Sequence, residues 1–305
     1  MQNLPRKDKS KVKQMFVSRF GEDGEMIEAD YSQLEVVGMG VLSNDAHLRA
    51  DLQAAVDFHC KRVSARFGCT YEDALNWCKN EHYEDYKLWK ERRTECKVFS
   101  FQRAYGAGAK KISATTGISV EAIEAMIEAE DALYPGVPLF HKAVQDSVER
   151  TARPFFDPVL GMACKRGYWQ SPTGTLYGFR SYPAPAYLKK QGIMDSFMPT
   201  EIKNYPTQGE SGFFVQAVLG KLIRHFIQNN FYNGMAYLVN TVHDCIWVDC
   251  HKSVLHEVVA DIKRIMQSIP EIFNTTFGMQ IDVPFPVEVE TGPDMYNLTH
   301  YDKAA

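Results

Sequence analysis

The sequence predicts an α+β fold in which an all-helical insertion follows the first strand. Two observations carry this prediction. Apolar, strand-like runs are spread along the chain and are separated by helical patterns. A long stretch with helical periodicity and no strand signal then divides the first run from the others. The strand signals lie at 26–31, near 168–177, at 236–242, at 245–250 and at 285–291.

The helical insertion contains clear start and stop signals. The first part of the insertion is expected to be helical up to Gly68, and Thr70 is the predicted N-cap of the next helix. A long helix is expected from about Glu84 to Tyr105, where Gly106 and Gly108 stop it. Two further helices are expected, one ending at 134–136 and one over 138–151. The insertion therefore forms a second domain.

The later strands alternate with two predicted helices. One is expected over 206–230, opened by Pro206 near its first turn, and the other over 253–268. The segment "AYLVNTVHDCIWVDC" reads as a hairpin that turns between Asn240 and Asp244.

Composition excludes several classes of protein. A chain of 305 residues is long enough for about two domains. No apolar run approaches the roughly 18 to 20 residues that a membrane span needs, and the start "MQNLPRKDKSKVKQMF" lacks the apolar segment of a signal peptide. Seven cysteines without a CxxC pair argue against a disulfide framework and a zinc ribbon. We expect a reducing, cytoplasmic location.

The net charge of −4 means that any nucleic-acid site must be a local basic patch. One such patch lies near the start of the chain and contains Arg6, Lys7, Lys9, Lys11 and Lys13. A basic run of this kind is more often a solvated arm than a binding site.

Within "RRTECKVFSFQRAYG", four residues recur at every fourth position: Arg93, Lys97, Phe101 and Tyr105. On a helix they form one stripe, with two cations at one end and two rings at the other. An ordinary core stripe would not place Arg and Lys in line with aromatic rings. The gradation matches a nucleoside triphosphate lying along the helix, with its phosphates on the cations and its sugar and base against the rings.

Two aspartates are expected in positions that are costly for an isolated carboxylate. Asp30 lies in an apolar strand and Asp244 at the tip of the predicted hairpin. Each alone is as compatible with a structural role as with metal binding. Together, and beside a helix suited to a triphosphate, they indicate a site for two Mg²⁺ ions, with Mn²⁺ as an alternative.

These segments resemble the three motifs of family A, polymerase I-like, DNA polymerases. "DYSQLE" at 30–35 is similar to the first motif, "RRTECKVFSFQRAYG" at 92–106 to the second and "VHDC" at 242–245 to the third. Further matches occur in the family's order: "QNLP" at 2–5, "LSND" at 42–45, "DFH" at 57–59, "YPG" at 134–136, "NYPTQG" at 204–209 and "VPFPVEVETG" at 283–292.

The resemblance implies a palm at 1–59 and 161–305, formed by an antiparallel sheet with helices, and inserted helical fingers at 60–160. In such a protein Asp30 and Asp244 are the catalytic, metal-binding carboxylates. The backbone carbonyl of Tyr31 completes the metal shell. The protein would add dNTPs to the 3′-hydroxyl of a primer by two-metal-ion nucleotidyl transfer.

The resemblance also assigns the residues that contact nucleotide and DNA. Arg93 and Lys97 would bind the triphosphate, and Lys97 would also be catalytic by protonating pyrophosphate. Phe101 and Tyr105 would face the nucleotide and the nascent pair. Gln33 and Glu35 would complete the nucleotide site, with Glu35 as a steric gate against the ribose 2′-hydroxyl. The DNA contacts would be Asn204 and Gln208 in the minor groove, His243 beside the primer terminus, and Lys203.

Three departures from the family pattern are visible. Cys245 stands where an acid usually follows the third-motif aspartate, and a thiol is a poor Mg²⁺ ligand. Thr200 stands where an Arg is usual, four residues before Asn204, with Lys203 as a substitute. Gln102 replaces the usual glycine.

Because Met1 falls just before "QNLP", the resemblance suggests either a truncated form of a longer chain or a phage-type split polymerase, which would lie in the host cytoplasm. A separate polypeptide would then supply the thumb and the 3′–5′ exonuclease, and this chain alone would synthesise DNA weakly and distributively. Two other functions remain open. A single-subunit RNA polymerase shares the palm and a similar helix, and Glu35 argues against it. A catalytically degenerate scaffold or DNA-binding protein would fit Cys245, but would not need Asp30, Asp244 and Arg93 intact.

Overall fold

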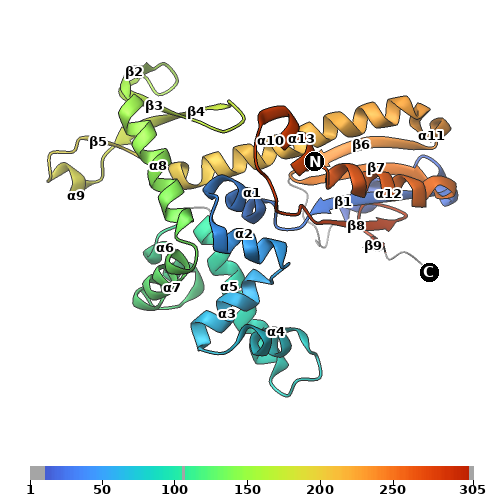
Figure 1. The fold of residues 1–305 in the computed structure, drawn as a ribbon, viewed down its shortest axis with the longest axis horizontal. Coiled ribbons are helices and arrows are strands. Elements are labelled where there is room, and N and C mark those ends of the chain that lie inside the picture. Colours follow the sequence, from blue (N-terminus) through green and yellow to red (C-terminus); the bar gives the residue numbers. More distant parts are fainter. Residues whose placement is uncertain (1–10, 105–106, 302–305) are drawn as a thin grey trace. The chain divides into compact units, whose positions relative to one another are not determined.

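The computed structural model describes residues 11–104 and 107–301 of the chain (Figure 1). The fold has two compact units, Met1–Gly38 with Gly209–Ala305 and Met39–Gln208. The boundaries between the units fall inside two helices, α1 (Leu34–Ser43) and α10 (Pro199–Gln228). The subdomain boundaries after residues 59 and 160 stay a prediction, because palm and fingers are functional divisions and the units are divisions by packing.

A five-stranded antiparallel sheet forms the centre of the first unit. Its strand order is β6-β7-β1-β8-β9. The strands are β1 (Gly24–Tyr31), β6 (Ala236–Val242), β7 (Cys245–His251), β8 (Val287–Gly292) and β9 (Thr299–His300). The predicted hairpin 236–242/245–250 is confirmed and has a turn of two residues.

Helix α12 (Leu255–Met266) packs on the sheet beside β1, β7 and β8 (Figure 1). Its buried side chains recur at three- and four-residue spacing, as an amphipathic helix requires: Val258, Val259, Ile262, Ile265 and Met266. The hydroxyl of Tyr31 donates a 2.8 Å hydrogen bond to the carbonyl oxygen of Met266. Because side chains alternate along a strand, Asp30 projects from the face opposite to Tyr31.

The remaining elements of this unit are short. They are the 3-10 helices η1 (Val12–Met15), η2 (Gly21–Asp23) and η3 (Lys252–Val254), with the helices α11 (Asn230–Gly234) and α13 (Ile269–Phe277).

Helix α10 corrects one prediction. The helix expected to open at Pro206 begins seven residues earlier, at Pro199, and contains Pro206 in its interior. Proline at an interior position leaves one carbonyl of the preceding turn without its helical N–H donor. Pro206 is buried, and helical packing on both sides of it outweighs that local cost. The position of Pro206 alone therefore predicted the wrong start for α10.

The second unit carries the predicted helical insertion. Its helices are α2 (Ala46–Gln53), α3 (Phe58–Phe67), α4 (Tyr71–Lys79), α5 (Tyr86–Ala104), α6 (Ala109–Thr116), α7 (Val120–Leu133) and α8 (Gly136–Thr151). The helix end at Gly68 and the cap at Thr70 are confirmed. Gly68 has a φ of 67°, which favours glycine, and the Thr70 side chain accepts a hydrogen bond from the Asp73 amide.

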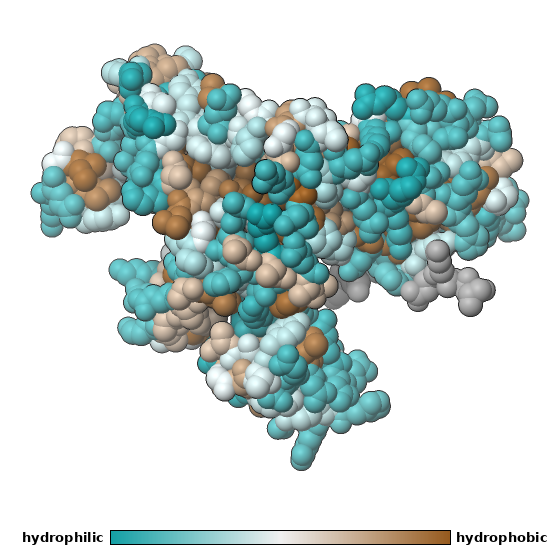
Figure 2. Space-filling model, viewed as in Figure 1, coloured by the Kyte–Doolittle hydropathy of each residue, from teal (hydrophilic) through white to brown (hydrophobic). Residues whose placement is uncertain are grey.

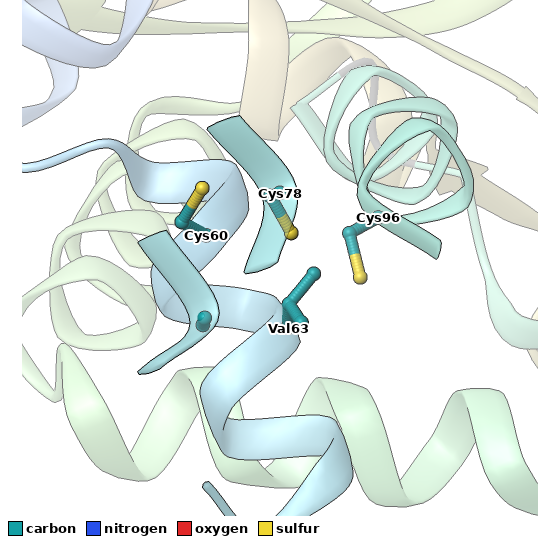
Figure 3. Close-up of a cluster of buried hydrophobic side chains, with 5 residues drawn as sticks. Cys60, Val63, Cys78 and Cys96 are labelled. Carbon is teal, nitrogen blue, oxygen red and sulfur yellow. The ribbon is translucent and has the colours of Figure 1, made fainter. Parts of the chain in front are cut away.

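Small side chains let α3, α4 and α5 pack closely. Cys60, Cys78 and Cys96 are buried together with Val63, one or two from each helix (Figure 3). All seven cysteines are free thiols. Burial raises the pKa of the Cys60 thiol to about 12, so the cysteines of this core act as small apolar side chains.

A second antiparallel sheet belongs to this unit, with strand order β2-β3-β4-β5. Its strands are β2 (Arg153–Asp157), β3 (Met162–Gln170), β4 (Leu176–Pro183) and β5 (Asp195–Phe197), and α9 (Ala186–Lys189) precedes β5. The single strand predicted near 168–177 is wrong. A turn at "SPTG", with Gly174 at a φ of 86°, divides it into two strands.

The surface around α9 is partly apolar. Tyr187, Ile193 and Met194 are exposed there, and brown atoms mark this tip in Figure 2. Among the described residues, no helix is both long and apolar enough to cross a bilayer. The α+β class predicted from the sequence is confirmed.

Candidate active site

The register of the first sheet brings two distant segments together at one end. Asp30, near the end of β1, is directly opposite Cys245, the first residue of β7. Val242 pairs with the same Cys245, so His243 and Asp244 form the turn between β6 and β7. Directly opposed residues of antiparallel strands have Cα atoms roughly 4.5–5.5 Å apart. Asp244 is therefore adjacent in sequence to the residue that faces Asp30.

The hairpin tip has an unusual backbone. His243 has a φ of 56°, in the left-handed region that residues other than glycine rarely adopt, and its side chain is exposed. A non-glycine residue there costs on the order of 1 kcal/mol or more, and such strain clusters at functional sites. The strain is a consequence of closing the two-residue turn that carries Asp244.

The face of the sheet that carries Asp30 also carries Glu28 and Cys245. Glu28 lies two residues before Asp30 on the same strand and is 7% exposed. Burial, the charges of Glu28 and Asp30 and a hydrogen bond with Glu28 together raise the pKa of the Cys245 thiol to about 12. Cys245 therefore stays a neutral thiol at physiological pH.

The other neighbour of β1 adds a further carboxylate. Glu288 on β8 pairs with Asp30, and its Oε1 accepts a 3.0 Å hydrogen bond from the hydroxyl of Ser32. Within the part of the chain that the structure describes, no group of three or more His, Cys, Asp or Glu side chains is arranged to hold a metal ion.

The donor chemistry at this end of the sheet nevertheless fits Mg²⁺. Asp30 and Asp244 offer carboxylate oxygens, and one oxygen of Asp30 is fully buried. The hydroxyl of Tyr31 is engaged with Met266, and metal binding by its backbone carbonyl stays a prediction. Mg²⁺ prefers oxygen ligands and takes one or two protein carboxylates together with substrate phosphates.

The first motif turns sharply from strand to helix. Gln33 has a φ of 59°, and its carbonyl accepts hydrogen bonds from the amides of Val36 and Val37 at the start of α1. Gln33 is exposed and Glu35, in the first turn of α1, is half-buried. The turn thus brings both predicted nucleotide-site residues close to Asp30 in the chain.

In the second unit, the predicted cationic row lies on α5. Arg93 Nη2 lies 2.7 Å from Asp57 Oδ2, and Lys79 Nζ lies 3.0 Å from the same oxygen. Burial alone would raise the pKa of Asp57, but hydrogen bonds from Arg93, Cys60 and Lys79 hold it below its ordinary value. Asp57 is therefore a carboxylate at neutral pH. Lys97, one turn further along α5, is exposed.

His59 also lies close to the cationic row. Its Nδ1 is 3.5 Å from the hydroxyl of Ser100 on α5. Burial and the charges of Arg62 and Arg93 together lower the pKa of His59 to about 4. His59 is neutral at pH 7.

Asp57 and His59 were not assigned roles from the sequence. The signal that could have found Asp57 is its place as an N-cap. Its side chain accepts hydrogen bonds from the amides of His59 and Cys60.

The aromatic half of the row stays a prediction. Tyr105 lies outside the described residues, as does the side chain of Phe101. Gln102, the departure next to Phe101, is half-buried, and its Oε1 is buried without a hydrogen-bond partner among the described residues.

Asn204 and Gln208 lie one turn apart on α10 and line one cavity of about 660 Å³. Thr200 lines the same cavity. Lys203 does not line it. Burial lowers the pKa of Lys203, and the charge of Arg103 lowers it further, while Asp131 acts in the opposite direction.

The predicted site residues are therefore divided between the units. Asp30, Tyr31, Gln33, Glu35, His243 and Asp244 belong to the first unit, and Arg93, Lys97, Lys203, Asn204 and Gln208 belong to the second. That the two groups meet around one nucleotide stays a prediction.

Comparison with known proteins identifies the class. The profile of the family described as "DNA polymerase family A" matches residues 1–297. The chain therefore belongs to DNA polymerase family A.

Individual relatives are more distant. The chain is 25% identical to DNA polymerase theta of Caenorhabditis elegans over 98% of its own length and 15% of that protein. It is 24% identical to DNA polymerase I of Pseudomonas aeruginosa over 96% of its length and 27% of that protein. The chain thus spans about one seventh to one quarter of the length of these two curated relatives.

A solved structure shares the fold. It is the POL domain of Pol1 from M. smegmatis, in complex with DNA primer-template and dNTP. The TM-score is 0.66 at 20% sequence identity, covering 98% of this chain and 45% of that one.

Proposed function

We propose that this chain is a DNA-directed DNA polymerase that adds dNTPs to the 3′-hydroxyl of a primer on a DNA template. One observation carries the proposal: the β1–β7 register, in which Asp30 faces the residue after Asp244. Membership of family A supports it, and the solved family structure holds primer-template and dNTP.

The residues of the first unit would hold the metal ions and exclude the wrong sugar. Asp30, Asp244 and the carbonyl of Tyr31 would bind Mg²⁺. When bound, two Mg²⁺ ions would lower the pKa of the primer hydroxyl and neutralise charge on the departing pyrophosphate. Glu35, the second residue of α1, would occupy the space that a ribose 2′-hydroxyl needs. His243, exposed at the hairpin tip, would lie beside the primer terminus.

The residues of the second unit would bind the triphosphate and the duplex. Lys97 is exposed and can contact phosphate oxygens directly, and it would protonate the pyrophosphate. Arg93 is held by Asp57, so its guanidinium would be oriented before the nucleotide arrives. Asn204 and Gln208 would donate to minor-groove acceptors, which every correct base pair presents.

Single-nucleotide extension of a labelled primer-template tests the proposal. We expect Asp30→Asn and Asp244→Asn each to lower the rate by at least about 10²-fold, because each removes a charged oxygen from the metal site. Asp146→Asn is the matched control, since Asp146 is 58% exposed on α8. Mn²⁺ binding followed by electron paramagnetic resonance should weaken in the first two variants only. Equal rates in wild type and both site variants would refute the proposal.

The companion polypeptide carrying a thumb and exonuclease stays a prediction. Adding that polypeptide should increase the number of nucleotides incorporated per binding event, and primer extension with an excess of trap DNA would measure it.

A further inference from the structure

The second sheet carries three arginines in one row across its strands. Arg153 on β2 is paired with Arg166 on β3, and Arg166 is paired with Arg180 on β4. Directly paired residues of antiparallel strands project from the same face, and neighbouring strands are about 4.8 Å apart. We call these three residues the arginine row.

Like charges placed directly opposite one another destabilise a sheet. Asp157 offsets the charge of one member of the row, since its Oδ2 lies 2.7 Å from Nη1 of Arg180. Within the described residues, no carboxylate lies within ion-pair distance of Arg166 or Arg153. The sheet therefore keeps a concentrated positive charge that its own carboxylates leave largely uncompensated.

Arg166 is held in place by an aromatic ring. Its guanidinium carbon lies 4.0 Å from the centroid of the Phe155 ring, and the side chain is half-buried. A cation stacked in this way keeps its N–H donors free for a further partner.

Two members of the row, Arg166 and Arg180, line the cavity of about 660 Å³ that α10 also lines. Arg166, Arg180 and Lys111 supply its cations, and Glu201 supplies a carboxylate that accepts a 2.8 Å hydrogen bond from Tyr182. Asn204 and Gln208 lie in the same wall. The cavity therefore combines planar cations with amides, within a single unit of the fold.

We propose that the arginine row and this cavity bind phosphates of the DNA backbone, with Arg166 as the principal contact. The ligand class follows from the chemistry, because guanidinium groups match phosphate oxygens and backbone phosphates make most protein–DNA contacts. The inference rests on the proposed function, which places Asn204 and Gln208 at the minor groove. Thr200 is uncharged, whereas an Arg is usual at this position. Arg166 on β3 would supply the missing positive charge to the cavity.

The test is the salt dependence of duplex binding by the full chain, measured by fluorescence anisotropy of a labelled primer-template. Loss of one phosphate contact should reduce the slope of log K against log salt by about 0.9 and weaken binding about three- to tenfold at low salt. We expect this for Arg166→Gln and a smaller effect for Arg153→Gln. Arg166→Lys keeps the charge and should retain most of the slope.

Lys142→Gln is the matched control. Lys142 lies in the same unit, is 70% exposed beside Asp146 and does not line the cavity. It should leave the slope unchanged, and thermal unfolding of each variant checks the fold.

Three results would overturn the inference: a wild-type slope in Arg166→Gln, an equal loss in Lys142→Gln, or an effect of Arg166→Gln on dNTP affinity without one on duplex affinity. Each leaves the primer-extension result for Asp30→Asn unaffected, so failure here is separable from failure of the proposed function.

Discussion

Arg93 and Asp57 form an ion pair of 2.7 Å between α5 and the start of α3. The two residues are 36 positions apart, and both side chains are largely shielded from water. Asp57 also caps α3, because its other carboxylate oxygen accepts hydrogen bonds from backbone amides at the start of that helix. One carboxylate thus fixes the start of a helix and the orientation of the predicted triphosphate arginine.

The charge and the cap can be separated by mutation. Asp57→Asn keeps an oxygen that can cap α3 but removes the charge that pairs with Arg93. We expect it to lower the free energy of unfolding by about 1.5–3 kcal/mol, the value of a hydrogen bond to a charged group. Asp57→Ala should cost about 1 kcal/mol more, because the cap is lost as well. Urea unfolding at pH 7 measures both. Equal losses in the two variants would show that the cap contributes nothing, and an unchanged stability in Asp57→Asn would show that the charge contributes nothing.

The same pair makes stability depend on pH. The pKa of Asp57 is held below its ordinary value in the folded chain. Its contribution to stability is therefore fully present above the unfolded pKa, about 3.9, and is lost as the pH falls toward the folded pKa. Wild-type stability should decrease below about pH 4 more steeply than that of Asp57→Asn. Parallel decreases in the two proteins would contradict the assignment.

Substitution of Cys245 by glutamate tests whether the predicted metal site tolerates a third acidic side chain. The side chain is 2% exposed, in hydrogen-bond contact with Glu28 and close to the charge of Asp30. Cys245→Glu would add a buried carboxylate beside two others, so we expect a loss of stability of about 1–3 kcal/mol and only a modest change in extension rate. Cys245→Ser is the matched control and should change both quantities less. If the wild-type protein is inactive and Cys245→Glu creates activity, the wild-type chain is the catalytically degenerate scaffold or DNA-binding protein.

Local sequence signals correctly predicted the helix ends that depend on a single residue. Gly68 ends α3 because a left-handed residue is needed there, and Thr70 caps α4 because its hydroxyl reaches the next free amide. The same logic gave the wrong start for α10, since packing overrides the local preference of Pro206. Sequence signals also merged β3 and β4 into one strand, because only a short turn separates Gln170 from Leu176.

The candidate site shows a second limit. The tip position of Asp244 follows from the hairpin pattern, but its closeness to Asp30 depends on the pairing of β1 with β7, which are more than 200 residues apart. The pairing of Asp57 with Arg93 and the arginine row depend in the same way on contacts between distant segments. Periodicity within one segment carries no information about such partners.

Glu35 provides a test of sugar selection. It lies in the first turn of α1, immediately after the turn that ends the strand of Asp30. We expect Glu35→Ala to reduce the preference for dNTP over rNTP by about 10- to 100-fold, since a removed steric contact admits the extra hydroxyl. Single-nucleotide incorporation with matched dNTP and rNTP gives the ratio, and Glu35→Gln, of nearly equal size, should retain most of it. An unchanged ratio in Glu35→Ala would place the gate elsewhere.

Gly167 and Gly212 should respond to the same substitution in opposite directions. A methyl group on Gly167 of β3 would lie 2.0 Å from the carbonyl oxygen of Val148 on α8, so the strand and helix would have to separate. Gly167→Ala should therefore lower the free energy of unfolding by about 1–3 kcal/mol. A methyl group on Gly212, inside α10, has no atom within 4 Å, so Gly212→Ala should raise it by about 0.5–1 kcal/mol through the better helix propensity of alanine. Urea unfolding of both variants measures the difference, and a loss of stability in Gly212→Ala as large as that in Gly167→Ala would show that the close approach of β3 to α8 is not its cause.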